Sequence, residues 1–236
     1  MSLCQTSSNS CGACCGIFNL NLKRDEYNKL LEDRSELFRS STDFSKRWTL
    51  SDYRKIRENK EISLNRIDDS IYVCPFLGFI EKNKIGCMIH PVYSGDPLSQ
   101  NVSFYGASIC QGYNCKNNAH EISDDFENFL NKYLNDDYYV YSNIVSDNIT
   151  FQCILDFFWE YGYTFNNIIS IYKELFLDLL TRKFTIGYYL NQTSFELENS
   201  IIESKLDRLL KRLNIKKDEK LYNRTLEVTK NPFRGF

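Results

Sequence analysis

Residues 7–20 read SSNSCGACCGIFNL and place Cys11, Cys14 and Cys15 close together, with Cys4 just upstream. Small residues separate these thiols, and the glycines among them permit the sharp backbone turns that let several sulfur atoms point inward. A metal ion in such a site needs about four thiolates at roughly 2.3 Å, converging from segments that turn sharply. The stretch therefore predicts one half of a metal-binding constellation.

The remaining thiols of this constellation come from two other segments in the first half of the chain. Cys74 and Cys87 lie on two short extended segments around a polar turn, and pairing across that turn would bring them together. Cys110 and Cys115 lie on either side of a glycine, where the chain can reverse. Cys153 falls in an apolar helical pattern, where we expect it only to pack in the core. The predicted metal ligands are Cys4, Cys11, Cys14, Cys15, Cys74, Cys87, Cys110 and Cys115.

The cellular compartment bears on how these cysteines are interpreted. The opening residues, MSLCQTSSNS, lack the basic and apolar segments of a secretory signal. No apolar run approaches the roughly 20 residues that span a bilayer. We therefore expect a cytoplasmic protein. In a reducing cytosol, clustered cysteines bind metal or do redox work more often than they form stable disulfides.

Core packing and disulfide formation account for the cysteines less well than metal binding does, although the number of sites stays open. Neither buried core thiols nor a disulfide framework would explain why all but one of the nine cysteines lie beside turn-forming residues in the first half. Adjacent residues such as Cys14 and Cys15 seldom both ligate one tetrahedral ion. They can face two separate sites, or one can bind metal while the other supports the fold.

The identity of the metal also stays open between zinc and an iron–sulfur cluster, because thiolates suit both. His90, three residues after Cys87, offers an imidazole that could complete a zinc site with three thiolates. A lone histidine more often forms hydrogen bonds at the surface, so its role stays open. His120 precedes a polar helix start, and we expect it to take no part.

Composition limits the classes of partner. The chain has 236 residues, of which 42% are hydrophobic and 15% aromatic, enough for one substantial core or two small domains. Its 29 basic and 31 acidic residues give a net charge of −2, so no global field would recruit nucleic acid or an anionic membrane. We expect neither partner, which leaves another protein as the partner class that the sequence still allows.

Helical periodicity dominates outside the cysteine segments. Apolar residues recur at helical spacing over 25–39, 50–58, 121–134, 147–161 and 166–182, and a capping box at Thr193 and Glu196 precedes a last helix. Residues 71–90 predict a short hairpin, 91–117 a loop and 228–236 an extended tail. The sequence thus predicts a mainly α fold with a small β-hairpin. A cysteine-rich metal-binding region, 1–117, would pack on an aromatic-rich helical region, 118–236, within one core.

The strings CGACC and CPFLGFIEKNKIGCMIHP resemble a family of zinc- or iron-chelating proteins with the CxxCxxCC motif, which includes flagellin lysine N-methylases. Cys11, Cys14 and Cys15 match the last three cysteines of the first family motif. Cys74, followed by Pro-Phe-Leu, matches the second motif, and Cys87 matches the third. The resemblance covers the first half of the chain and implies a bound zinc or iron centre without fixing an activity.

The chain departs from this family pattern in three places. The first motif cysteine of the family falls at Ser8, and we expect Cys4 to take its place from upstream. The stretch after Cys87 is contracted and has no arginine. The final family cysteine is displaced to Cys110 or Cys115.

Three hypotheses for function follow. The first is a metal centre with a mainly structural or accessory role. The second, which the resemblance suggests, is an iron–sulfur redox enzyme or a protein-modifying enzyme similar to the methylases. The third is a redox sensor in which Cys14 and Cys15 react reversibly as thiolates. The sequence has no Walker loop, dinucleotide-binding glycine pattern or metalloprotease motif, so no catalytic residue is predicted and enzymatic activity stays open.

Overall fold

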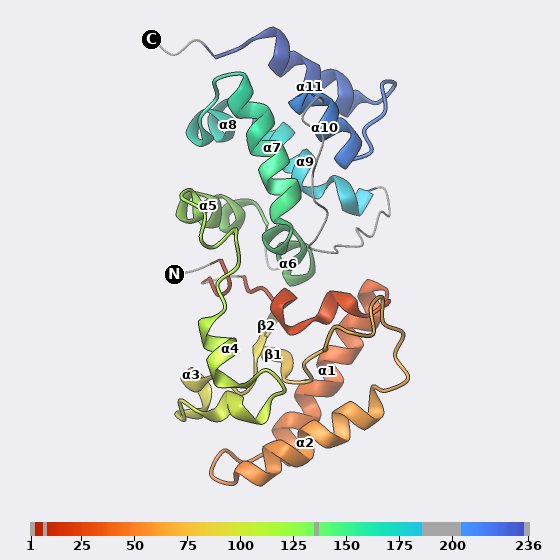
Figure 1. The fold of residues 1–236 in the computed structure, drawn as a ribbon, viewed down its shortest axis with the longest axis vertical. Helices are drawn as coiled ribbons and strands as arrows, with labels where there is room; N and C mark the ends of the chain where they lie inside the picture. Colours follow the sequence, from red (N-terminus) through yellow and green to blue (C-terminus); the bar gives the residue numbers. More distant parts are fainter. Residues whose placement is uncertain (1–2, 7–8, 135–136, 186–203, 234–236) are drawn as a thin grey trace. The chain divides into compact units, whose positions relative to one another are not determined.

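Helices make up most of the structure, which is a computed structural model (Figure 1). It describes residues 3–6, 9–134, 137–185 and 204–233. Within these ranges the helices are accompanied by one two-stranded antiparallel hairpin, which confirms the predicted mainly α fold with a small hairpin. The chain divides into two compact units, Met1–Ser146 and Asp147–Phe236, and each is described by itself. The predicted division at residue 117 and the shared core stay predictions.

The first unit contains both strands and most of the short helices. Its elements are η1 (Ala13–Cys15), η2 (Ile17–Asn19), α1 (Arg24–Ser41), α2 (Arg47–Lys60), β1 (Leu77–Glu81), β2 (Lys84–Cys87), α3 (Pro91–Ser94), η3 (Ser99–Val102), α4 (Gly106–Gly112), α5 (Ser123–Tyr133) and α6 (Tyr138–Ser146), where η denotes a 3₁₀ helix. The predicted helices at 25–39, 50–58 and 121–134 are confirmed as α1, α2 and α5. Helix α6 was not predicted.

Helices α1 and α2 pack against the hairpin segment to form the core of the first unit. The N–H of Lys23 donates to Glu26 Oε2 at 2.6 Å, which satisfies a free donor at the start of α1. The buried cluster consists of Phe38, Leu50, Tyr53, Cys74, Phe76, Met88 and Ile89. Phe38 and Tyr53 pack edge to face, with ring centroids 5.1 Å apart and planes at 88°. This aromatic packing adds to the stabilisation that burial alone provides.

The hairpin lies within the predicted range 71–90. Leu77 pairs with Cys87 and Gly78 pairs with Gly86 in antiparallel register. Asn83, in the turn, has a φ of 61°, a conformation that asparagine adopts more readily than most residues. The hairpin prediction is therefore confirmed. Cys74 precedes β1 rather than lying in a strand.

The prediction of a loop over 91–117 is wrong, because this segment contains α3, η3 and α4. Pro91 occupies the first turn of α3, where its missing N–H breaks no helical hydrogen bond. Gly95 ends α3 in the left-handed conformation, with a φ of 68°. The proline and glycine that suggested a loop thus begin and end a short helix.

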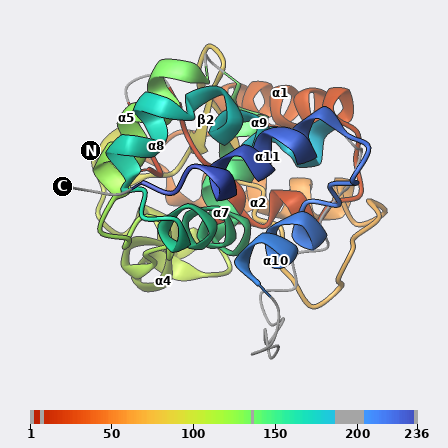
Figure 2. The same cartoon turned by 90° about the horizontal axis from the view of Figure 1, so that it is seen from above.

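Helices are the regular secondary structure of the second unit in its described residues. It consists of α7 (Asn148–Glu160), α8 (Phe165–Ile171), α9 (Lys173–Thr185), α10 (Lys205–Arg212) and α11 (Lys220–Lys230). Helix α7 packs against α9 and α10, and Figure 2 shows α7 and α10 side by side. As predicted for 147–161, α7 is buried on most sides, through Thr150, Phe151, Cys153, Ile154, Leu155, Phe157 and Phe158.

The single helix predicted over 166–182 is wrong, because the chain bends at Tyr172 between α8 and α9. Tyr172 has a φ of −117° and a ψ of 24°, outside the helical region. Its ring lies 5.1 Å from Tyr163 and 5.7 Å from Phe158, and its hydroxyl is 3.1 Å from the Tyr163 hydroxyl. Aromatic packing therefore overrides the helical periodicity at this point.

The C-terminal part of the second unit tests the prediction only in part. The capping box at Thr193 and Glu196 lies outside the described residues and stays a prediction. Helix α10 begins after Ser204, whose side chain accepts the N–H of Asp207 at 3.1 Å. The tail from 228 is not extended at its start, because α11 continues to Lys230.

Candidate functional site

Helix α6 holds the cysteine-rich opening segment in place. The Tyr141 hydroxyl donates to the carbonyl of Leu3 at 2.8 Å. The Ser142 hydroxyl accepts the N–H of Gly12 at 3.1 Å, and the Cys11 thiol donates to the carbonyl of Ser142 at 3.8 Å. These bonds give a segment that has only short 3₁₀ helices of its own a defined path beside α6.

The 3₁₀ helix η1 carries Cys14 and Cys15 on consecutive residues. Successive residues of a 3₁₀ helix are about 120° apart around its axis, but the thiols of Cys14 and Cys15 turn toward each other and are hydrogen-bonded. Gly16 ends η1 with a φ of 75°, and a Cβ there would lie 2.2 Å from the carbonyl oxygen of Tyr72. Gly16 therefore allows the chain to approach the backbone just before Cys74.

A first group of thiols gathers around Cys4 and Cys115. These two thiols, far apart in the sequence, are hydrogen-bonded to each other. The N–H of Cys11 donates to the carbonyl of Cys4 at 3.0 Å. Cys11 and Cys14 both lie within electrostatic reach of Cys4 and Cys115. The opening segment and the segment after α4 thus meet through their sulfur atoms.

A second group gathers around Cys74. The N–H of Cys74 donates to the carbonyl of Cys15 at 2.8 Å, and their thiols are also hydrogen-bonded. Cys15 and Cys87 both pack against the core cluster that contains Cys74. Cys87 interacts electrostatically with Cys74 and with Cys110 of α4. The predicted approach of Cys74 and Cys87 therefore occurs, with Cys15 and Cys110 beside them.

The contacts between thiols shift their pKa values in opposite directions. The hydrogen bond with Cys4 holds the pKa of Cys115 at about 6, and the hydrogen bond with Cys15 holds the pKa of Cys14 at about 7. A hydrogen bond with Cys15 also lowers the pKa of Cys74. The same contacts, together with burial, raise the pKa of Cys4 and Cys15. Each contact thus lowers the pKa of one thiol and raises the pKa of the other.

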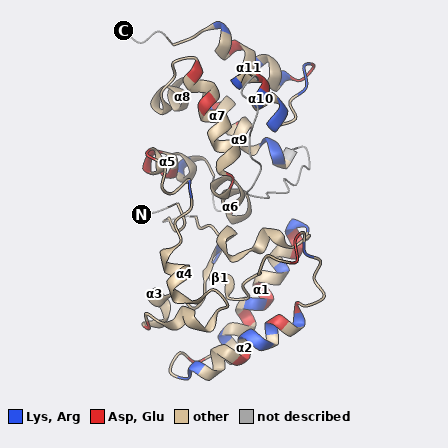
Figure 3. Ribbon diagram, in the orientation of Figure 1, with Lys and Arg blue, Asp and Glu red and all other residues tan. Residues whose placement is uncertain are grey.

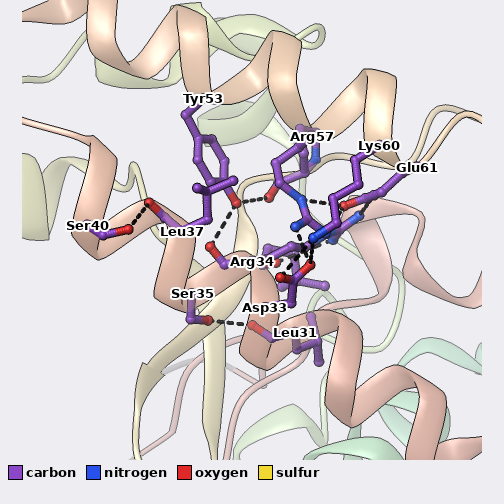
Figure 4. Close-up of polar contacts among 12 residues, drawn as sticks. Leu31, Asp33, Arg34, Ser35, Leu37, Ser40, Tyr53, Arg57, Lys60 and Glu61 are labelled. Carbon is purple, nitrogen blue, oxygen red and sulfur yellow. Dashed lines mark hydrogen bonds and ion pairs between the residues drawn. The ribbon is translucent and has the colours of Figure 1, made fainter.

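Arg34, on α1, positions the backbone that carries Cys74. Figure 4 shows its side chain inside the core next to Glu61, with Arg57 and Asp33 nearby. One guanidinium nitrogen donates to the carbonyls of Cys74 and Leu77, at 3.1 and 3.3 Å. The other two donate to the Glu61 carboxylate at 2.9 and 2.5 Å. The rigid donor fork of arginine therefore ties both ends of the segment 74–77 to α1.

Charged residues lie mainly away from the thiols. Figure 3 shows lysine, arginine, aspartate and glutamate gathered on α1 and α2, whereas β1, α3 and α4 carry few of them. Arg34 is the buried exception near Cys74, and its charge adds to the lowering of the pKa of that thiol. Sulfur atoms are therefore the main side-chain groups in this part of the first unit that could act as metal donors.

The described residues include all the predicted ligands but show no closed metal site. No group of three or more His, Cys, Asp or Glu side chains among them is close enough together to hold a metal ion. The cysteines are free thiols that meet in contacting pairs with near neighbours. Their sulfur donors suit zinc and iron in kind. Nδ1 of His90 accepts the N–H of Val92 at 3.2 Å, so this histidine caps α3.

Comparisons of the chain with known protein families, with curated proteins and with solved structures find no match. The resemblance of the cysteine motifs to the CxxCxxCC family therefore stays a prediction. In the part of the chain that the structure describes, no helix combines the length and the apolar character of a membrane span.

Several polar groups that touch the sulfur atoms were missed in the sequence. Gln100 Nε2 donates to Cys87 Sγ at 3.6 Å, and the Ser103 hydroxyl lies 3.8 Å from Cys110 Sγ. The N–H of Asn118 donates to Cys115 Sγ at 3.4 Å. Polar residues occur near cysteines in many sequences, so their presence alone does not predict a contact with sulfur.

Proposed function

We propose that this protein binds zinc or an iron–sulfur centre through its cysteine thiolates, with a mainly structural or accessory role. One observation carries the proposal: thiols from distant segments meet in contacting pairs, Cys4 with Cys115 and Cys15 with Cys74. If the cysteines were placed only by core packing, we would not expect thiols from separate turns to contact each other. A bound metal would supply a cross-link between these turns.

The energetic benefit of such a cross-link would be large. Structural zinc contributes roughly 10–16 kcal/mol of apparent folding free energy in small peptides, compared with about 5–15 kcal/mol for the whole stability of an ordinary domain. The opening segment forms only the short helices η1 and η2 before α1. It therefore has little secondary structure of its own to hold it against the hairpin, and thiolate ligation would do so.

Elemental analysis and an absorption spectrum of protein purified without oxygen test the proposal. We expect stoichiometric zinc in colourless protein, or iron and sulfide in brown protein. The brown result would favour the redox or methylase-like hypothesis. Protein that is folded by circular dichroism but contains neither metal would contradict metal binding.

Substitution of a ligand tests the structural role. Cys74→Ser should lose metal and unfold more readily, because Cys74 is 5% exposed and contacts Cys15. Cys153→Ser is the matched control, since Cys153 is also buried but lies in α7 of the second unit. It should keep its full metal content. A metal-replete Cys74→Ser protein of unchanged stability would overturn the structural role.

One observation favours thiol redox sensing as a second candidate function. Cys14 is exposed, and its hydrogen bond with Cys15 holds its pKa at about 7, so much of it is thiolate near neutral pH. Reversible oxidation at Cys14 by hydrogen peroxide, detected by mass spectrometry of the metal-free protein, would support this function. Reaction no faster than at Cys153 would contradict it.

A further inference from the structure

Asn118 ties the opening segment to the segment that follows α4. Its side-chain Oδ1 accepts the N–H of Leu3 at 3.0 Å, and its own backbone N–H donates to Cys115 Sγ at 3.4 Å. Leu3 directly precedes Cys4, so one asparagine holds the backbone beside the first thiol and the sulfur atom of the second. The thiols of Cys4 and Cys115 are hydrogen-bonded to each other. Hydrogen bonds to Asn118 therefore hold this thiol pair together from both sides.

Helix α6 anchors the same two segments on consecutive turns. The Tyr141 hydroxyl donates to the carbonyl of Leu3 at 2.8 Å, and the Asn117 side chain donates to the carbonyl of Val145 at 2.8 Å. Tyr141 and Val145 are four residues apart, and residues at this spacing lie on one face of a helix. Tyr141 and Asn117 are both buried, so the two anchoring bonds belong to the core. Helix α6 thus keeps the two segments side by side.

We infer that Cys4 and Cys115 form a reversible disulfide when a hydroperoxide oxidises the protein. The inference goes beyond the proposed metal binding, because it needs two thiols and no metal ion. Neither thiol lies in a helix or a strand, since Cys4 precedes η1 and Cys115 follows α4. The sulfur atoms can therefore move from hydrogen-bonding distance to the bonded distance of about 2 Å without breaking a helix or the hairpin.

Solvent reaches this thiol pair. Cys4 and Cys115 are both partly exposed, and Asn114 and Lys116, on either side of Cys115, are exposed. Cys74, which takes part in the other contact between distant thiols, is only 5% exposed. Thiols that sense oxidants are accessible and have a second thiol beside them that reacts with the oxidised sulfur. Cys115 fits the first of these roles and Cys4 the second.

The reaction has two balanced steps. In the first, the Cys115 thiolate attacks an oxygen of the hydroperoxide. A sulfur–oxygen bond forms, the oxygen–oxygen bond breaks, and the leaving oxygen takes a proton from solvent to give an alcohol or water. In the second, the Cys4 sulfur attacks the sulfenic sulfur of Cys115, and the hydroxide leaves as water with the proton of Cys4. The two thiols together lose two electrons, which reduce the hydroperoxide.

The disulfide would change both the opening segment and the set of metal donors. It would close the long loop between Cys4 and Cys115 and so restrict the unfolded chain. It would also withdraw two of the predicted metal ligands, so oxidation and metal binding would compete for this pair. That competition rests on the proposed metal binding, whereas the disulfide itself does not.

Mass spectrometry of the full chain tests the disulfide. The reduced protein, freed of metal by a chelator, is treated with equimolar hydrogen peroxide, and its remaining thiols are alkylated. One disulfide withdraws two of the nine cysteines, so the intact mass should show seven alkylated thiols instead of nine. Fragment spectra of the unreduced digest should link Cys4 to Cys115, and dithiothreitol should restore all nine thiols.

Variants separate this pair from its neighbours. Cys4→Ser should stop the reaction at the sulfenic acid of Cys115, which a cyclic dione reagent traps. Cys115→Ser should leave Cys4 without a disulfide. Cys14→Ser and Cys153→Ser are the controls, because Cys14 is exposed and lies near Cys115, whereas Cys153 is buried in α7. Both controls should still form the disulfide.

The outcomes distinguish the disulfide from the proposed functions. A wild-type protein that keeps nine alkylated thiols would overturn the inference and leave metal binding untouched. A disulfide between Cys14 and Cys115 that persists in Cys4→Ser would also overturn it, and would favour Cys14 as the reactive thiol. Because the linked residues are identified in the wild-type protein, the test stays decisive if a variant fails to fold.

Discussion

Replacing Arg34 with methionine should lower the free energy of unfolding of the first unit by about 3–5 kcal/mol, the usual effect of removing one partner of a buried ion pair. The Arg34 side chain is fully buried and its partner Glu61 is 10% exposed. Arg57 also donates to Glu61, at 2.8 Å, so this carboxylate keeps one cation. The carbonyls of Cys74 and Leu77 each lose a donor, and an unsatisfied buried group costs about 1–3 kcal/mol. The two carbonyls account for most of the expected effect.

Urea denaturation followed by far-UV circular dichroism measures this change, with metal content determined for each protein. A loss of 3–5 kcal/mol corresponds to roughly a hundred- to several-thousand-fold shift in the unfolding equilibrium constant. Arg47→Met is the matched control, because Arg47 begins α2 and pairs with Asp96 while 54% of its side chain is exposed. It should leave the midpoint unchanged within error, since exposed ion pairs contribute little. Equal midpoints for Arg34→Met and Arg47→Met at equal metal content would refute the reasoning.

Three further predictions concern pH, thiol reactivity and backbone conformation. Burial opposes ionisation of Glu61, but Arg34 and then Arg57 hold its pKa below the ordinary 4.5. The stabilisation by the Glu61 carboxylate should therefore be complete above pH 4.5 and fade on acidification. In Glu61→Gln, the midpoint of urea denaturation should depend less on pH than in the wild-type protein. In metal-free folded protein, Cys115 should react with iodoacetamide near pH 6 far faster than Cys153. The reason is that the pKa of Cys115 is about 6, whereas burial raises the pKa of Cys153. Equal alkylation rates, measured by peptide mass spectrometry, would contradict this prediction. Gly16→Ala should lower the melting temperature more than Gly95→Ala. Both glycines have a positive φ, but only at Gly16 would the added Cβ lie 2.2 Å from a backbone oxygen. Equal decreases in melting temperature would show that this close contact does not contribute.

The sequence predicted local structure well where a single periodicity governed it. Helices α1, α2, α5 and α7 follow the apolar spacing, because each buries one face or, in α7, most of its surface. The prediction failed at Tyr172, where the chain bends beside the aromatic rings of Phe158 and Tyr163. It also failed over 91–117, where proline and glycine cap short helices instead of preventing them.

The candidate site could be predicted only in part. The residue types and the clustering of the cysteines identified the thiols, because sulfur chemistry and turn-forming neighbours are visible in the sequence. The contacts of Arg34 with the carbonyls around Cys74 were not visible, since they join α1 to a segment far along the chain. Ser142 was missed for the same reason: it lies in α6, a helix that was not predicted, and it bonds to the opening segment.

The amino-acid sequence by itself determined the helical character, the hairpin and the set of thiols, because these depend on neighbouring residues and on side-chain chemistry. Only the tertiary structure decided which thiols meet: Cys4 with Cys115, and Cys15 with Cys74. Those pairings depend on the packing of α6 against the opening segment and of α1 against the hairpin, which brings together residues that sequence spacing leaves far apart. Long-range packing, rather than local pattern, therefore turns a cysteine-rich sequence into defined groups of sulfur donors.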